Sequence, residues 1–341
     1  MLRGLSMHVA LLALAVLAEL YVWTRDKKTA EAAVADVTVW SGAADDVQKL
    51  GFEGKGKTVT LEAKSDAAGR WFLGKAVTTS APKADAGPPT VPQTAPKTVT
   101  FVSVAAAQKV AEALAPFRAL RDLGKIAGAQ DADFGFKEPE GTVSVTISGT
   151  EHKLLVGGST PGGNDRYLRD EGTGEGYAAK GDFVRDLESG DGSLTERDAH
   201  GYKDEDLKEV RIVARGKSRV VLRRGPEGKR IWADGSDPEK ADETATNWLA
   251  KIDRLRPTEY LPEVGGVPEP VVRLEYAVKG ASGIFFELAK LPASPAPEAT
   301  DAGAPSAKHE YVARSERTRL WTKVPSGVAE QVEQDLGSVL K

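Results

Sequence analysis

The chain has 341 residues, of which 28% are charged, with 46 basic and 50 acidic side chains and a pI near 5.8. Because nucleic-acid-binding proteins normally carry a basic face and a basic pI, this balance argues against a nucleic-acid partner. The absence of cysteine excludes disulfides, thiolate nucleophiles, iron–sulfur clusters and cysteine-bound zinc. The length suits two or three ordinary domains.

Residues 1–28 have the character of a membrane segment. Arg3 precedes an uninterrupted apolar run over residues 9–18, and Arg25, Lys27 and Lys28 follow it. The run has the length of a signal-peptide core, whereas residues 5–23 give nearly a full membrane span. We expect an uncleaved signal-anchor, with export after signal cleavage as the alternative. Positive-inside counting by itself would leave the body in the cytoplasm, because more basic residues follow the run than precede it.

Two tracts interrupt an otherwise regular pattern. Residues 78–98 and 291–308 are rich in Ala, Pro, Ser and Thr and contain almost no large apolar side chain. Such segments cannot bury enough apolar surface to offset the entropy of ordering. We interpret both as loop insertions.

With these inserts removed, the sequence shows an internal repeat of hairpins. Residues 58–73 resemble residues 219–234, and a leucine precedes a tryptophan by ten residues in each: Leu61 and Trp71, Leu222 and Trp232. Residues 166–187 resemble residues 310–336 in the same way, with Tyr167 and Tyr177 matching Tyr311 and Trp321. The recurrence predicts that Trp71, Trp232 and Trp321 anchor the core, with Trp248 doing so from a helix.

A helix is expected after each of the first hairpins. Residues 104–124 carry apolar side chains at a three-residue spacing, and so do residues 237–257. In the second segment, Asp237 and Pro238 predict the helix start, as N-cap and first helical residue.

These patterns predict an α+β fold built from a tandem-duplicated module. Each copy contains antiparallel hairpins or meanders, each followed by a helix, behind the N-terminal membrane segment. The expected domains are residues 1–28 for the anchor, 29–200 for the first copy with its insert at 78–98, and 201–341 for the second copy with its insert at 291–308.

The chain resembles a bacterial family known only as domain of unknown function 4340. The resemblance rests on GRW at residues 69–71, on LLVGG followed by RYL, and on LKEVRIVARGKSRVVLRR, and spans most of the chain beyond residue 36. The family has an N-terminal membrane segment and a repeated α+β body, but no established activity and no assigned catalytic residues. Many members are encoded near ABC-transporter or gliding-type auxiliary genes, so the resemblance implies a membrane-anchored accessory role outside the inner membrane.

The strongest chemical motif is the glycine-rich stretch LLVGGSTPGGNDRYLR, residues 154–169. A phosphate-binding loop of the P-loop type needs a lysine and a following helix, and neither is present. A dinucleotide-binding fingerprint is absent as well. Gly, Pro, Asn and Asp between two strands are ordinary hairpin-turn residues, so we expect a turn.

No other pattern predicts catalysis or metal binding. The four histidines, His8, His152, His200 and His309, show no metal-ligand spacing, and we expect them to be exposed on strands or loops. The acidic stretch 189–209 lacks the features of an EF-hand loop and is interpreted as a solvated connector, with weak cation binding as the alternative. We therefore assign no catalytic, cofactor-binding or metal-binding residue and expect no cofactor.

The sequence thus favours a non-enzymatic, membrane-tethered envelope protein with an accessory or scaffolding role. Its expected location is the bacterial inner membrane, single-pass, with the body in the periplasm and other envelope proteins as partners. Exposed strand edges between the repeat units could accept a partner strand. The alternative is a hydrolase or a sugar- or lipid-binding protein with a site in the cleft between the copies.

Overall fold

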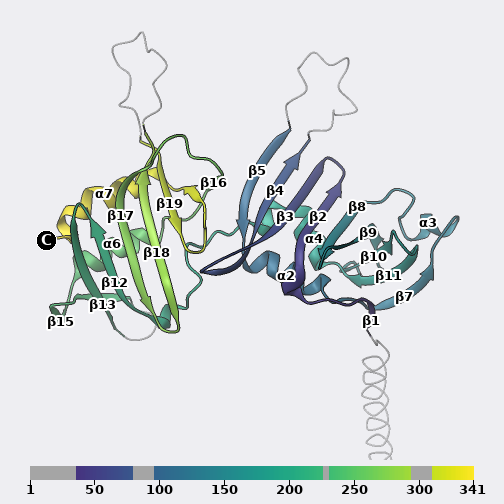
Figure 1. The fold of residues 1–341 in the computed structure, drawn as a ribbon, viewed down its shortest axis with the longest axis horizontal. Helices are drawn as coiled ribbons and strands as arrows, with labels where there is room; N and C mark the ends of the chain where they lie inside the picture. Colours follow the sequence, from purple (N-terminus) through teal and green to yellow (C-terminus); the bar gives the residue numbers. More distant parts are fainter. Residues whose placement is uncertain (1–35, 80–95, 226–229, 293–308) are drawn as a thin grey trace, which may run out of the picture.

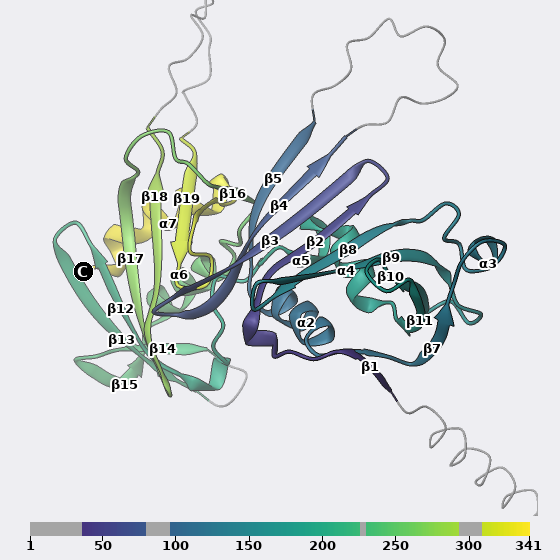
Figure 2. The ribbon, with the colours of Figure 1, turned by 45° about the vertical axis from the view of Figure 1, so that its right-hand side comes forward.

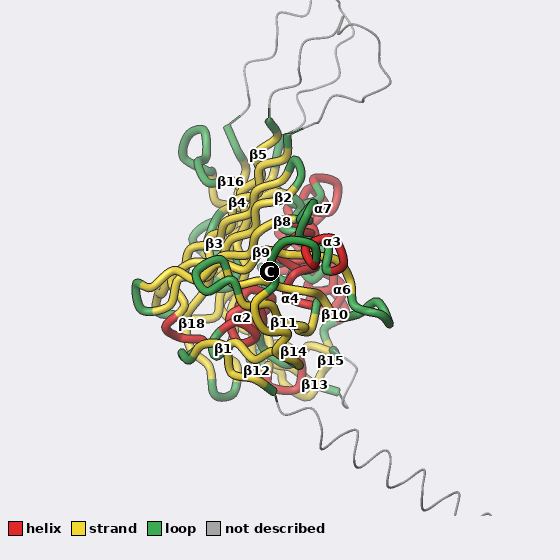
Figure 3. The backbone as a smooth tube through the Cα atoms, turned by 90° about the vertical axis from the view of Figure 1, so that its right-hand side faces the viewer, coloured by secondary structure: helices red, strands yellow, loops and turns green. Residues whose placement is uncertain are grey.

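The computed structural model describes residues 36–79, 96–225, 230–292 and 309–341 (Figure 1). Strands are the commonest secondary structure in this part of the chain, as Figure 3 shows in yellow. They form two nine-stranded antiparallel sheets and a separate pair of β1 (Val37–Trp40) with β6 (Phe117–Ala119). The expected α+β class is therefore confirmed in its coarse form, with strands outweighing helices. The predicted anchor at 1–28 lies outside the described residues.

The first sheet is built from the first half of the chain. From edge to edge its strands are β5 (Lys97–Ser103), β4 (Gly69–Thr78), β3 (Lys57–Asp66), β2 (Val47–Gly54), β8 (Gly141–Ile147), β9 (Thr150–Ser159), β10 (Asp165–Asp170), β11 (Glu175–Lys180) and β7 (Arg121–Lys125). Because β5 begins at Lys97, the last two residues of the predicted insert at 78–98 belong to a strand instead.

The second sheet is built from the second half of the chain. From edge to edge its strands are β15 (Asp237–Ala241), β14 (Ile231–Asp234), β13 (Lys217–Arg224), β12 (Leu207–Ala214), β17 (Glu269–Val278), β18 (Ala281–Lys290), β19 (Tyr311–Ser315), β20 (Trp321–Lys323) and β16 (Glu259–Leu261). Strand for strand, this order repeats that of the first sheet. The chain passes through both sheets by the same route.

Two helices pack against each sheet. In the first they are α2 (Ala105–Leu114) and α4 (Asp182–Ser189), and in the second α6 (Glu243–Ile252) and α7 (Ser326–Val339). The short remaining helices are η1 (Ala44–Asp46), α3 (Gln130–Asp133), α5 (Asp191–Leu194) and η2 (Asp204–Asp206). We call residues 36–194 the first unit, 195–203 the connector and 204–341 the second unit.

Both predicted helix ranges were too long. The segment expected to be helical over residues 104–124 leaves the helix after Leu114, because Pro116 disfavours helical geometry at Ala115 and has no backbone N–H to donate. The helix expected to start at Asp237 starts at Glu243 instead. Its N-cap is Asp242, whose side chain accepts a hydrogen bond from the backbone N–H of Ala245, and the preceding residues form β15.

The aromatic positions that marked the repeat are displaced by one residue. In the first unit Leu61 of β3 pairs with Gly74 of β4, and in the second unit Val221 of β13 pairs with Asp234 of β14. Two residues before Gly74 and Asp234 lie Phe72 and Trp232, which therefore hold equivalent positions. Both are buried. Trp71, one residue away, is only partly buried, as is Trp321, whose neighbour Thr322 is buried instead. Trp232 and Trp248 are therefore core residues as predicted, whereas Trp71 and Trp321 are not fully so.

The glycine-rich stretch is a hairpin corner, as predicted. It connects β9 to β10, which pair antiparallel. Thr160 donates its backbone N–H to Asp165 (3.0 Å), and Gly163 donates to Thr160 (2.9 Å). Gly162 and Gly163 have φ of 111° and 84°, a region that L-residues with side chains rarely adopt.

Within the described ranges, no helix has the length and apolar character needed to cross a membrane.

Candidate functional site

The acidic stretch 189–209, which the sequence suggested to be solvated, is exposed only in part, because the connector within it packs between the two units at Glu196. Glu196 is 9% exposed, and its backbone N–H donates to the carbonyl of Val102 on β5 (2.7 Å). Its carboxylate forms an ion pair with Arg317 (2.8 Å), and its carbonyl accepts the hydroxyl of Tyr260 (2.8 Å). Glu196 therefore contacts one residue of the first unit and two of the second.

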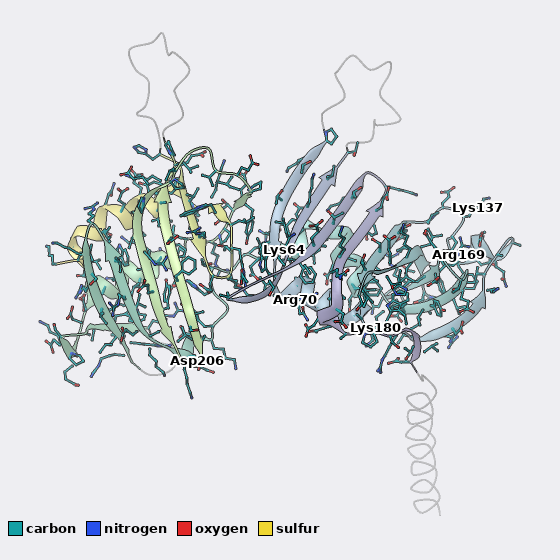
Figure 4. All side chains as sticks on the ribbon, viewed as in Figure 1. Lys64, Arg70, Lys137, Arg169, Lys180 and Asp206 are labelled. Carbon is teal, nitrogen blue, oxygen red and sulfur yellow. The ribbon has the colours of Figure 1, made fainter. Side chains whose placement is uncertain are left out.

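Side chains of the second unit extend the core of the first. Tyr260 of β16 is 5% exposed and belongs to the first unit's hydrophobic core, against which Leu320 also packs. Arg319 forms an ion pair with Asp66 (3.2 Å), and it donates to the carbonyl of Ala68 in the β3–β4 turn (3.3 Å). Figure 4 shows Lys64 and Arg70, which flank that turn, on the side of the first unit nearest the second. These contacts hold the two units together.

An open cleft of about 680 Å³ lies along this junction. Its walls come from both units, and we call it the junction cleft. Its lining residues are Lys97, Thr98, Val99, Thr100 and Phe101 of β5, Asp191 and Thr195, Arg197 of the connector, and residues 257–262 around β16. β5 and β16 lie side by side in three views (Figure 1, Figure 2 and Figure 3).

The carboxylates of the junction cleft already have cationic partners. Asp191 lies 3.6 Å from Lys57, and Glu259 lies 3.3 Å from Lys323. The hydrogen bond to Glu259 raises the pKa of Lys323 above its ordinary value. Burial raises the pKa of Tyr260, so its hydroxyl remains a neutral donor at physiological pH. The arrangement favours polar binding over acid–base chemistry, which needs groups that titrate near the working pH.

One wall of the junction cleft is an unpaired sheet edge. β5 pairs with β4 on one side only, and the carbonyl of Val102 points away from β4, toward Glu196. Because backbone direction alternates along a strand, the N–H and C=O groups of Thr98 and Thr100 point the same way. Among the described residues, these groups have no hydrogen-bond partner. The facing strand β16 is the edge of the second sheet and forms no ladder with β5.

A second hollow, of about 350 Å³, lies further along the connector. It is lined by Asp198, Ala199, His200, Tyr202, Arg230, Ile252, Asp253, Leu255, Arg256 and Phe286. All of these belong to the connector or to the second unit. We call it the His200 pocket.

His200 is enclosed, in contrast to the exposed position expected from the sequence. Its side chain is 14% exposed, and Nδ1 lies 3.3 Å from Oε1 of Glu316, which is itself buried. The other oxygen of Glu316 accepts the backbone N–H of Phe285 (3.1 Å). The imidazole lies against the rings of Tyr202 and Tyr276, at centroid distances of 5.1 and 4.6 Å. Burial raises the pKa of both tyrosines, so both rings are neutral at physiological pH.

The remaining histidines do not converge with His200. His152 of β9 stacks on Trp40 at 4.5 Å, His309 is exposed, and His8 lies outside the described residues. Within the described ranges, no cluster of His, Asp and Glu is arranged to hold a metal ion. The pairing of His200 with Glu316 could not be read from the sequence, because 116 residues separate them and no short motif links them.

The comparisons with known proteins identify one family. Residues 111–271 match the family described as domain of unknown function (DUF4340). The match runs from α2 to β17 and includes the connector, but it is shorter than the range suggested by the sequence and leaves out the GRW motif at 69–71. No curated protein and no solved structure matches the chain. The resemblance inferred from the sequence is thereby confirmed over residues 111–271, which match the domain-of-unknown-function 4340 family.

Proposed function

We propose that the protein is a non-enzymatic accessory or scaffolding protein of the bacterial envelope, tethered to the membrane, that binds another envelope protein in the junction cleft. The observation that carries this proposal is the cleft itself. Both units build its walls, its carboxylates are neutralised by lysines, and one wall offers unpaired backbone groups. Such a surface suits recognition of a polypeptide more than bond-breaking chemistry.

The proposed location is the inner membrane, with a single span near residues 5–23 and the body in the periplasm. Support comes from the apolar run and from the family resemblance, which also suggests association with an ABC-transporter-type or gliding-type complex. Export after signal cleavage is the alternative. A reporter fused to the C-terminus, active only outside the cytoplasm or only within it, distinguishes a periplasmic body from a cytoplasmic one.

We also propose that the two units arose by tandem duplication. The two nine-stranded sheets have the same order, and α2 and α4 correspond in chain position to α6 and α7. The inserts at 78–98 and 291–308 then represent later additions at two different hairpins.

The binding proposal is tested by cross-linking in intact cells, followed by purification of the tagged full chain from detergent-solubilised membranes. Thr258→Trp fills the cleft from an exposed position, and Lys137→Trp is the matched control at the far end of the first unit, where Figure 4 labels Lys137. We expect one envelope protein to be recovered reproducibly with the wild type and the control, and several-fold less with Thr258→Trp. Recovery of no envelope protein, or equal recovery with both variants, contradicts the proposal.

A second candidate function, a hydrolase or a sugar- or lipid-binding protein, is favoured by the His200 pocket. A histidine oriented by a buried carboxylate is an arrangement used for general-base catalysis. The pocket belongs to the second unit and the connector, so it is not the inter-copy site that the sequence suggested. Hydrolysis of a panel of ester, glycoside and amide substrates that His200→Gln abolishes would favour this candidate over the first.

A further inference from the structure

We propose that strand β5 is the docking site of the partner, and that it takes up an extended segment of another protein as an additional antiparallel strand. This inference rests on the proposed function and gives it a specific site and a specific mode of binding.

The first argument is the direction of the backbone groups. Thr98 and Thr100 each present one N–H and one C=O to the junction cleft, as deduced from the outward carbonyl of Val102. An added strand pairs with such groups through main-chain hydrogen bonds, largely independent of its sequence. All ladders within the two described sheets are antiparallel, which favours the same orientation for the incoming strand.

The second argument comes from comparing the four edges of the two sheets. Proteins protect edge strands with charges, proline, irregular backbone or short length. β15 reads DPEKA, β7 reads RDLGK with Gly124 at positive φ, and β16 has only three residues between Pro257 and Pro262. β5 reads KTVTFVS, with β-branched residues at its centre and one charge at its start. Of these four edges, β5 alone lacks these protections in its own sequence, and the connector and β16 cover only part of it.

The third argument is size. One residue of an added strand fills about 160 Å³, from about 3.3 Å of rise, about 4.8 Å between strands and about 10 Å across both faces. The junction cleft, at about 680 Å³, therefore holds roughly four residues of an extended chain. The opposite wall, with Tyr260, Leu261 and Pro262, would contact the side chains of the incoming strand.

The same geometry selects the occupant. A second copy of this chain would have to offer its own β5, which is flanked by β4 on one side and by its own β16 on the other. A second copy would therefore bring β4 and β16 along with its β5, and these strands together are too bulky for a cleft that holds roughly four residues of one extended chain. A flexible or terminal segment of a different protein can enter it.

The test uses the full chain in detergent micelles and a phage-displayed library of random ten-residue peptides as the probe. Peptides that are enriched are synthesised, and each backbone amide is N-methylated in turn. Thr100→Pro removes one outward N–H, and Thr98→Asp places a charge on the edge in the manner of β15. Lys240→Asp on β15 is the matched control, and thermal unfolding followed by circular dichroism verifies that each variant is folded.

We expect binding to fall at least tenfold with Thr100→Pro and Thr98→Asp, and to be unchanged with Lys240→Asp. N-methylation is expected to abolish binding at every second amide. The proposal is overturned if no peptide is enriched, if Thr98→Asp binds as well as the wild type, or if sedimentation shows that the wild-type chain self-associates through β5. If the cross-linked partner is still recovered with Thr98→Asp, the proposed function stands and only the docking strand is wrong; if no partner is recovered with the wild type, the function itself fails.

Discussion

β5 of the first unit and β15 of the second occupy the same place in two sheets of identical strand order, yet they differ in each property that governs strand pairing. The last three of the seven residues of β5, Phe101, Val102 and Ser103, are fully buried, whereas all five residues of β15 are exposed. The connector and β16 cover part of β5, and nothing comparable covers β15 within the described residues. The comparison shows how one topology can keep a protected edge in one unit and build a cleft beside the same edge in the other.

The cores of the two units differ as well. α2 and α6 each have ten residues, and the sixth of each is buried: Val110 in α2 and Trp248 in α6. Trp248 also donates its indole N–H to the carbonyl of Val332 (2.8 Å), which ties α6 to α7. The second unit thus depends on one large residue where the first uses a small one.

The largest expected effect follows from that difference. Trp248→Ala should destabilise the second unit by about 3–5 kcal/mol, because it leaves a large cavity and removes the indole hydrogen bond to Val332. Val110→Ala should cost the first unit about 2 kcal/mol, since far fewer buried atoms are lost. Urea unfolding followed by far-UV circular dichroism measures both. Equal losses for the two variants would contradict the inference that the second unit depends more on this position than the first does.

The next effect concerns the junction. Tyr260→Ala should cost about 3 kcal/mol, because a second-unit ring is removed from the first unit's core. The matched variant Tyr260→Phe removes only the hydrogen bond to Glu196 and should cost about 1 kcal/mol. We expect Tyr260→Ala to make the two units unfold in separate calorimetric transitions. A single transition at an unchanged temperature would mean that the units do not depend on each other through this ring.

The sequence predicted the path of the chain better than its details. Alternating hairpins revealed the strands and the repeated order, because burial of one sheet face imposes a period of two. The predicted repeat register was wrong by one residue, because Trp71 and Phe72 are adjacent large aromatics and the sequence pattern does not show which of them faces the core. The helix predicted over 104–124 was too long because the apolar spacing continues past Pro116, whereas the helix itself ends at Leu114.

The candidate site was largely beyond sequence reasoning. Whether β5 is an edge depends on which strand ends the sheet, and the contact between His200 and Glu316 depends on folding across 116 residues. One signal was available: β5 lacks the proline and the interspersed charges found in β15, which marks it as an unprotected strand once its place at the edge is known.

A third prediction compares the two units in acid. α6 is capped by the carboxylate of Asp242, whereas the hydroxyl of Ser103 accepts the backbone N–H of Ala107 in α2 (3.1 Å). Burial acts to raise the pKa of Asp242, but hydrogen bonds from Ala245 and Arg219 outweigh it and leave that pKa below its ordinary value. Hydrogen bonds from Ser236, followed by that from Arg219, lower the pKa of Asp234 to about 2.

Depressed acid pKa values stabilise the fold at pH values above the unfolded pKa, near 4, and this stabilisation is lost as the pH falls through the folded pKa. The second unit should therefore lose stability between about pH 4 and about pH 2. Asp242→Asn should cost about 1 kcal/mol at pH 7 and make the stability of the second unit depend less on pH. Ser103→Ala should lower stability by a similar mechanism but leave its pH dependence unchanged. Thermal unfolding at a series of pH values measures the slopes. If stability depends on pH as steeply in Asp242→Asn as in the wild type, the carboxylate of Asp242 does not cause the dependence.

The smallest expected effect lies at the β9–β10 corner, whose counterpart in the second unit is the β18–β19 connection carrying the insert at 291–308. Gly163 has φ of 84°, and a methyl group there would meet no atom within 4 Å. Gly163→Ala should therefore cost about 1 kcal/mol through backbone strain alone. Gly158→Ala is the control, because its backbone is extended and its added methyl would meet only the carbonyl oxygen of Phe134 at 3.7 Å; it should change stability by less than about 0.5 kcal/mol. Equal stabilities for the two variants would mean that the corner relaxes freely, as expected of a turn that tolerates insertion. A loss confined to Gly163→Ala would mean that the first unit needs its tight corner to hold β10 in register, which the second unit achieves without one.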